Sequence, residues 1–210
     1  MREGSADSRV AEAFVMLENA VEALAMRLSE VQLPLHILLS SPFGELNENQ
    51  EELLAAAREA TDAADLHLRQ LAKLLELERG AMTMMREPIG LQDLLRPALA
   101  IAEAHAKQRR IDFQVRISGT APRVVVDAVH AQEALSAILT SLVQRVPERS
   151  DISVDAVENE SGGVRIVVNH EDAELTRSLE QRLATRLIEA QHGCVRDERR
   201  QTTIVLPHGP

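Results

Sequence analysis

Apolar residues recur with a seven-residue period along the first third of this chain. Between residues 14 and 35 the repeat is occupied by Phe14, Leu17, Val21, Leu24, Leu28, Val31 and Leu35. A second run, from about residue 49 to residue 78, has the same period at Leu54, Ala57, Thr61, Ala64, Leu68, Leu71 and Leu75. Repeats of this length are typical of helices in a coiled coil or a helical bundle. The sequence therefore predicts two long helices.

A breaker cluster at residues 40–44, Ser-Ser-Pro-Phe-Gly, separates the two helices, which predicts a helical hairpin over residues 11–80 after a disordered start at residues 1–10. One hairpin exposes a long apolar stripe, so we expect two copies to form a homodimeric four-helix bundle. The alternative is that the stripe packs on the chain's own second domain. The residues expected at the dimer seam are Phe14, Leu17, Val21, Leu24, Leu28, Leu68, Leu71 and Leu75.

The rest of the chain alternates helices and strands after a linker at residues 81–90. Helices are expected at residues 91–108, 129–144 and 173–191, and strands at residues 111–117, 124–126, 152–157, 164–168, 194–196 and 202–206. This order predicts an α/β sandwich over residues 91–210, with one mixed sheet covered by helices on one face. The fold class expected for the whole chain is α+β.

Charge and residue types exclude several functions. The net charge is −10 and there is no long basic run, which disfavours a nucleic-acid partner. The one cysteine, Cys194, excludes an internal disulfide and a cysteine-based zinc site. The polar cluster at residues 170–172 has no second ligand motif beside it, so we expect a loop there and no metal or cofactor. No apolar run is long enough for a membrane span or a signal peptide, so a cytoplasmic protein without a membrane partner is expected.

Four stretches resemble the transmitter of sensor histidine kinases. Residues 29–35, Ser-Glu-Val-Gln-Leu-Pro-Leu, resemble the phospho-acceptor box His-Glu-Leu-Arg-Thr-Pro-Leu. Residues 74–91 resemble the end of the second bundle helix and the linker into the ATP-binding domain. Residues 127–147 have the length and apolar pattern of the helix that bears an Asn, and residues 187–207 resemble the closing helix and final strand. The resemblance implies a dimerisation and phosphotransfer hairpin followed by an ATP-binding domain of the GHKL type.

The resemblance places the phospho-acceptor at Ser29, with the acidic neighbour retained as Glu30. An unactivated alcohol is a far poorer nucleophile than imidazole, so autophosphorylation is not expected. His36 has the same heptad position one repeat later and is a possible alternative acceptor. The other interpretation is an ordinary exposed histidine, since Pro34 and the shift along the bundle should spoil the alignment with a receiver aspartate.

The resemblance also implies that the nucleotide site is degenerate. Ser141 stands where the family has its Mg-coordinating Asn, and the carboxylate that reads adenine is replaced by Asn169 or by His170. The phosphate-cradling glycines align with residues 178–180, where Ser178 and Glu180 replace them. Glycine allows close approach of the backbone to phosphate, whereas a glutamate repels it. The lid between Asp172 and the closing helix is reduced to a few residues, so nucleotide binding is not expected.

We therefore expect a non-catalytic, pseudokinase module of two-component signal transduction. It would act as a homodimer and bind a response-regulator receiver domain or a histidine kinase through Ser29, Glu30, Gln32, His36 and His67. A second hypothesis is a histidine phosphotransferase that relays phosphate between receivers through His36. A third is an active ATP-dependent kinase with unusual residues.

Overall fold

The computed structural model describes residues 3–40, 44–118, 123–158, 163–171 and 178–207. The chain divides into two compact units, Met1–Arg79 and Gly80–Pro210. Together they form an α+β chain with a helical hairpin and a mixed sheet, as the sequence predicts. Among the described residues, no helix is long and apolar enough to cross a membrane.

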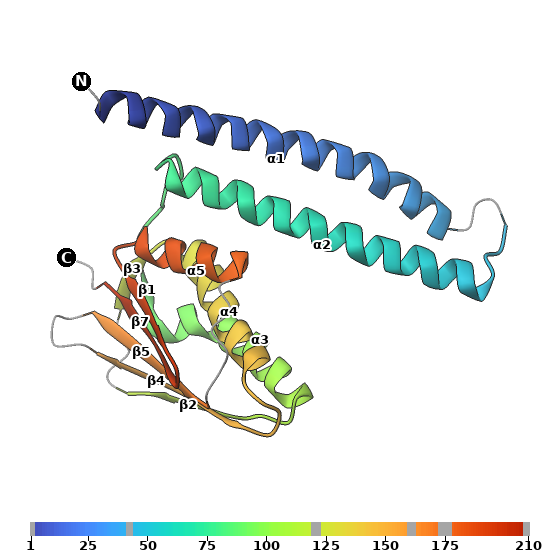
Figure 1. Ribbon diagram of the computed structural model, residues 1–210. Coiled ribbons are helices and arrows are strands. Elements are labelled where there is room, and N and C mark those ends of the chain that lie inside the picture. The colour runs from blue at the N-terminus through green and yellow to red at the C-terminus, as the bar shows by residue number, and fades with distance from the viewer. Residues whose placement is uncertain (1–2, 41–43, 119–122, 159–162, 172–177, 208–210) are drawn as a thin grey trace. The chain divides into compact units, whose positions relative to one another are not determined.

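The first unit is an antiparallel hairpin of helix α1 (Glu3–Leu39) and helix α2 (Glu48–Glu78), which lie side by side in Figure 1. Helix α1 begins at Glu3, so residues 3–10 are helical where a disordered start was expected. The helix can extend toward the N-terminus because residues 6–13 include no Gly or Pro. A capping box begins α2, since Asn47 Oδ1 accepts from the Gln50 amide and Gln50 Oε1 accepts from the Asn47 amide, both at 3.0 Å.

The expected seam of α1 alternates between two heptad positions, one with Phe14, Val21 and Leu28 and the other with Leu17 and Leu24, and the two have different surroundings in the hairpin. Val21 is buried and Phe14 and Leu28 are partly buried, whereas Leu17 and Leu24 are 51% and 57% exposed. The residues of α1 that are shielded are Phe14, Glu18, Val21, Ala25, Leu28, Gln32, Leu35 and Leu39. One neighbouring helix covers only one side of α1, so half of the expected seam lies inside the hairpin and the other half faces outward.

Two polar contacts cross between the helices of the hairpin. Gln32 Nε2 lies 3.5 Å from Asp62 Oδ1, and Arg79 pairs with Glu18. The later residue of α1, Gln32, meets the earlier residue of α2, and the earlier residue of α1, Glu18, meets the residue at the end of α2, as an antiparallel arrangement requires. On α2, Leu68 and Leu71 are partly buried and Leu75 is buried, so these expected seam residues face α1.

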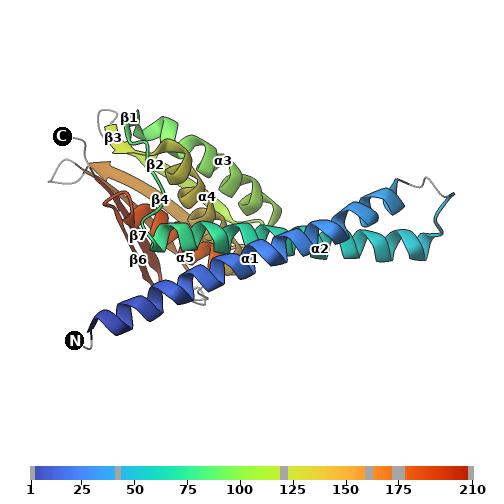
Figure 2. The same ribbon diagram turned by 90° about the horizontal axis from the view of Figure 1, so that it is seen from above.

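The second unit is built on a five-stranded mixed sheet with the order β2-β4-β5-β7-β6. Strand β2 (Asp112–Ile117) pairs in parallel with β4 (Asp151–Glu158), whereas β4 with β5 (Val164–His170), β5 with β7 (Gln201–Leu206) and β7 with β6 (Cys194–Glu198) are antiparallel. Helices α3 (Leu91–Gln108), α4 (Ala128–Arg145) and α5 (Leu179–Glu189) cover one face of this sheet, as Figures 1 and 2 show. Alternate strand residues such as Val154, Ile166 and Ile204 fill the core beneath them.

Three expectations for the second unit need correction. Strand β3 (Arg123–Val126) does not join the main sheet, because it pairs with β1 (Glu87–Gly90) in a separate two-stranded antiparallel sheet. Residues 87–90, expected as part of a linker, are therefore a strand of the second unit. The helix expected at residues 173–191 is α5 at Leu179–Glu189, and residues 173–177 lie outside the described residues.

Candidate functional site

Ser29, which the sequence resemblance places at the phospho-acceptor position, lies exposed on α1. Its hydroxyl donates a 3.0 Å hydrogen bond to the carbonyl oxygen of Ala25, one turn earlier. A serine needs a neighbouring base to act as a nucleophile, and a carbonyl oxygen does not remove a proton. The neighbouring Glu30 is also exposed and pairs with Arg27 at 3.0 Å. The arrangement leaves Ser29 accessible to a partner and chemically unactivated.

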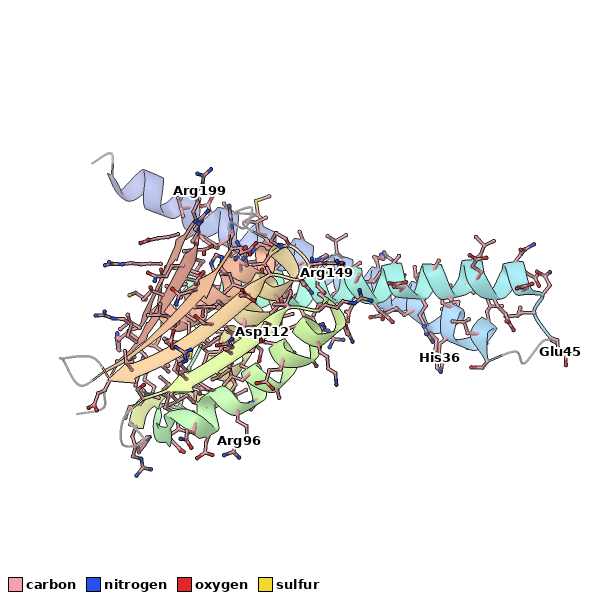
Figure 3. The ribbon with its side chains drawn as sticks, turned by 90° about the horizontal axis from the view of Figure 1, so that it is seen from below. His36, Glu45, Arg96, Asp112, Arg149 and Arg199 are labelled. Atoms are coloured by element: carbon pink, nitrogen blue, oxygen red, sulfur yellow. The ribbon has the colours of Figure 1, made fainter. Side chains whose placement is uncertain are left out.

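The other residues expected to bind a partner divide into two groups. His36 and His67 are exposed, and Figure 3 shows His36 projecting from α1 away from the hairpin. Because Gln32 lies opposite Asp62 in antiparallel helices, His67 is level with the turn of α1 that carries Ser29. Gln32 itself is half-buried and turns toward α2, so it supports the hairpin more than its outer surface.

Ser141 and Ser178 stand close together at the junction of α4 and α5. The hydroxyl of Ser141 accepts a 2.9 Å hydrogen bond from Gln181 Nε2. Ser178 is the N-cap of α5, and its hydroxyl accepts from the Gln181 amide at 3.2 Å. Glu180 lies exposed in the first turn of α5. A helix N-terminus attracts anions, and here the protein supplies its own carboxylate at that end.

The structure decides which residue of β5 faces the helices. Asn169 lies on the open face of the sheet, where its Nδ2 donates to Ser153 Oγ at 3.1 Å and its Oδ1 accepts from Gln201 Nε2 at 2.9 Å. His170 is 6% exposed and lies on the face that the helices cover. Since successive strand residues point to opposite faces, only one of the two can face the helix layer. Of the two residues considered for the adenine-reading position, His170 is the one that faces the helix layer.

Asp127 joins three segments of the second unit. Its Oδ1 caps α4 by accepting from the His130 amide at 3.2 Å, as expected from its place before that helix. Its Oδ2 also accepts from the Met85 amide at 2.9 Å, and its own amide donates to Oε1 of the fully buried Gln191 at 2.6 Å. Burial raises the pKa of Asp127, but hydrogen bonds from the backbone of Met85 and His130 and the nearby His130 ring lower it, and the net pKa is below its ordinary value.

A cavity of about 640 Å³ opens at the end of the sheet where β4 begins and β5 ends. It is lined by Asp112, Gln114, Pro147, Asp151, Ile152, Ser153, Asn169, His170, Glu171 and Arg200. Its lining includes three carboxylates and one guanidinium, a balance that disfavours a triphosphate. Ser141, Ser178 and Glu180 are not part of this lining. Among the described residues, no group of three or more His, Cys, Asp or Glu side chains could hold a metal ion.

The sequence matches no family model and no curated protein, whereas the structure matches solved histidine kinases. The histidine kinase AdeS of Acinetobacter baumannii is 12% identical with a TM-score of 0.65, over 87% of this chain and 96% of that one. Full-length ShkA in complex with AMPPNP is 18% identical with a TM-score of 0.69, over 88% of this chain and 45% of ShkA. The catalytic domain of ThkA is 16% identical with a TM-score of 0.53, over 60% of this chain and 99% of that domain. The chain therefore has the fold of a histidine-kinase core, in which a helical hairpin precedes a domain of the ATP-binding type.

Proposed function

We propose that this chain is a non-catalytic signalling module of two-component systems. It dimerises through the hairpin and binds a response-regulator receiver domain or a kinase partner. The observation that carries the proposal is that α1 keeps an open apolar row of seven-residue period while a serine occupies its phospho-acceptor position. The hairpin retains what association needs, and the position expected for the phospho-acceptor carries a hydroxyl in place of an imidazole.

The open row consists of Val10, Leu17, Leu24, Val31 and Leu38, each seven residues after the last. Their exposed fractions lie between 39% and 57% within a single chain. Residues of one heptad position follow one side of a helix, so the row is a continuous stripe along α1. Contiguous exposed apolar surface marks an interaction site, and a second copy of the same hairpin offers a stripe of matching length and period.

Loss of nucleotide binding is supported by the contacts at each expected nucleotide position. Ser141 is hydrogen-bonded to Gln181 of α5. The inward residue at the end of β5 is His170, whose two ring nitrogens already lie near protein oxygens. Glu180 places a negative charge in the first turn of α5, where phosphate would otherwise be attracted. We infer that this domain serves as a structural or docking domain.

The surface offered to a receiver domain is the polar strip of Ser29, Glu30, His36 and His67. These residues are exposed, and Ser29 and His36 share one side of α1. Binding to this strip would change the phosphorylation state of a partner by occupancy. A receiver aspartate would meet a serine hydroxyl there, so the partner would be held without phosphate transfer.

The test combines a mass measurement with a binding measurement. Light scattering should give twice the chain mass of 23.2 kDa. Immobilised protein should then retain receiver domains or kinases of the host in a complex that Glu30→Arg weakens, while a charge reversal at exposed Glu59 on α2 leaves it unchanged. A monomeric mass, or retention that is indifferent to Glu30→Arg, contradicts the proposal.

A second candidate is favoured by the exposure of His36 on the same side of α1 as Ser29. The chain would then relay phosphate between receivers as a histidine phosphotransferase. Incubation with a phosphorylated receiver distinguishes the two functions, since the relay requires an acid-labile label on the wild type that is lost in His36→Ala. An unlabelled wild-type chain excludes the relay and leaves the first proposal intact.

A further inference from the structure

The segment at residues 85–90, which leads into α3, is fastened to the rest of the second unit in three ways. The Met85 amide donates to Asp127 Oδ2 at 2.9 Å. The guanidinium of Arg86 donates through Nη2 to the carbonyl oxygen of Ala190 at 2.7 Å. Strand β1 then follows and pairs with β3. The segment therefore bridges the start of α4, at Asp127, and the end of α5, at Ala190.

The ladder between β1 and β3 is weak by itself. The two strands form a separate sheet of four residue pairs, and an isolated two-stranded sheet is marginally stable in water. Pro88 has no amide proton, so β1 has one backbone donor fewer. The side chain of Arg123 adds one contact, because its Nη2 donates to the Pro88 carbonyl oxygen at 3.3 Å. The segment thus depends on its side-chain contacts to stay closed.

Opening of the segment would remove little apolar surface from the protein interior. Met85 is 74% exposed in the closed state, and residues 86–88 are exposed as well. Ile89 and Gly90 are partly buried. Segments that bury few apolar side chains open at a lower free energy than the core of the same domain. The segment can therefore open while the three helices on the sheet stay folded.

The carboxylate that holds the segment is itself held from the other side. Asp127 Oδ1 caps α4 by accepting from the His130 amide, and the Asp127 amide donates to Oε1 of the buried Gln191 at 2.6 Å. Gln191 Nε2 in turn donates to the Leu187 carbonyl oxygen at 3.1 Å. These bonds do not involve the segment, so Asp127 Oδ2 stays in position to receive the Met85 amide again after each opening.

We propose that residues 85–90 form a strap that opens and closes as one unit on the second unit of the chain, with Asp127 as its clasp. The strap directly follows residues 80–84, which join it to α2. Along the chain it is therefore the first element of the second unit that a change in the hairpin reaches. Release of the strap takes one partner from the start of α4 and one from the end of α5. The strap requires neither dimerisation nor a receiver partner.

Hydrogen exchange of the full chain, followed by mass spectrometry, tests the strap. Peptides covering residues 85–90 report the strap, and peptides from residues 135–142 of α4 report the core. In Asp127→Ser the hydroxyl still caps α4, whereas the oxygen that holds Met85 is lost. Exchange of the strap should rise by about tenfold or more, the usual effect of losing a hydrogen bond to a charged group. Exchange of the core peptides should stay as in the wild type.

Arg86→Met is the second variant, because it keeps an apolar stem and removes the guanidinium that reaches Ala190. If the strap is one unit, this change near its start also speeds the exchange of residues 87–90. Asp151→Ser, at an exposed aspartate that begins β4, is the control and should leave the strap unchanged. Strap peptides that exchange as slowly in either variant as in the wild type overturn the proposal. A rise that is equal in the strap and the core also overturns it.

Discussion

Gln181 Nε2 of α5 donates a 2.9 Å hydrogen bond to the hydroxyl of Ser141 on α4. The position at which the resemblance to histidine kinases expects a Mg-coordinating Asn is thus used to join two helices of the domain. The same Gln181 donates its backbone amide to the N-cap Ser178. One residue of α5 therefore links both of the serines that the resemblance places at nucleotide-binding positions.

The Ser141–Gln181 bond predicts a measurable contribution to the stability of the second unit. Gln181→Ala should lower the free energy of unfolding by about 1 kcal/mol, the usual worth of a hydrogen bond between partly buried neutral groups. Urea unfolding followed by circular dichroism measures the change. Arg182→Ala, one residue later and exposed on the same helix, is the control and should stay within about 0.5 kcal/mol of wild type. Equal effects of the two substitutions would show that the bond contributes nothing.

The open apolar row on α1 predicts a separation of dimerisation from folding. Leu24→Glu places a charge on the outward side of the hairpin, so it should yield a monomer that keeps its helix content. Val21→Glu buries the same charge between α1 and α2 and should unfold the hairpin, because burial of an unpaired carboxylate costs several kcal/mol. Light scattering and circular dichroism at the same concentration separate the outcomes. A Leu24→Glu chain that remains dimeric would place the interface elsewhere.

The lowered pKa of Asp127 predicts that the stability of the folded chain decreases as the solution becomes acidic. The pKa of its carboxyl group is lowered in the folded chain, so the carboxylate stabilises the fold above the pKa of an unfolded aspartate, and this contribution is lost as pH falls below about 4. Asp127→Ala should cost about 1–2 kcal/mol at neutral pH from loss of the helix cap. The free energy of unfolding of the variant should also decrease less than that of the wild type as the pH falls below about 4.

The control for Asp127 is Asp93, which is exposed in the first turn of α3 and pairs only at the surface with Arg96. Asp93→Asn should change the free energy of unfolding at neutral pH by less than about 0.5 kcal/mol, because its ion pair lies at the surface. Chemical denaturation at several pH values compares the two variants. Parallel pH profiles for wild type and Asp127→Ala would contradict the assigned role.

The close packing around Gly193 predicts that replacing it with alanine destabilises the fold. A methyl group on its α-carbon would lie 2.6 Å from the Val205 carbonyl oxygen and 2.7 Å from Ile188 Cγ2. The first of these atoms belongs to the backbone of β7, so Gly193→Ala should cost about 1–3 kcal/mol through forced displacement of packed atoms. A fall in the thermal midpoint relative to wild type measures it. An unchanged thermal midpoint would mean that the atoms at the junction of α5 and β6 can move to accommodate the methyl group with no loss of stability.

The hairpin and the order of the elements were predictable because periodicity is a local property of the sequence. The heptad repeat indicated the seam, but it could not say that Val21 faces α2 while Leu24 faces outward, since that depends on which side a single neighbour covers. Strand β1 was missed because residues 87–90, Glu-Pro-Ile-Gly, have a Pro and a Gly, which are typical of a linker. Only its partner, β3, makes that segment a strand.

The candidate site was predictable where a residue's role follows from its neighbours in sequence. Asp127 directly precedes α4 and caps it, a role that its residue type and its place in the sequence suffice to indicate. Its bond to Met85 joins residues 42 positions apart and has no local signal. The choice between Asn169 and His170 required the register of β5, because one step along a strand exchanges the two faces of the sheet.

Titration of the full chain with ATP in the presence of Mg²⁺ tests the central claim most directly, with the thermal midpoint of unfolding as the measurement. A ligand that binds only the folded state must raise this midpoint as its concentration rises. The account predicts no shift at any ATP concentration up to the millimolar range, because Ser141, His170 and Glu180 occupy the expected nucleotide positions. A saturable rise in the midpoint that is lost without Mg²⁺ would contradict it.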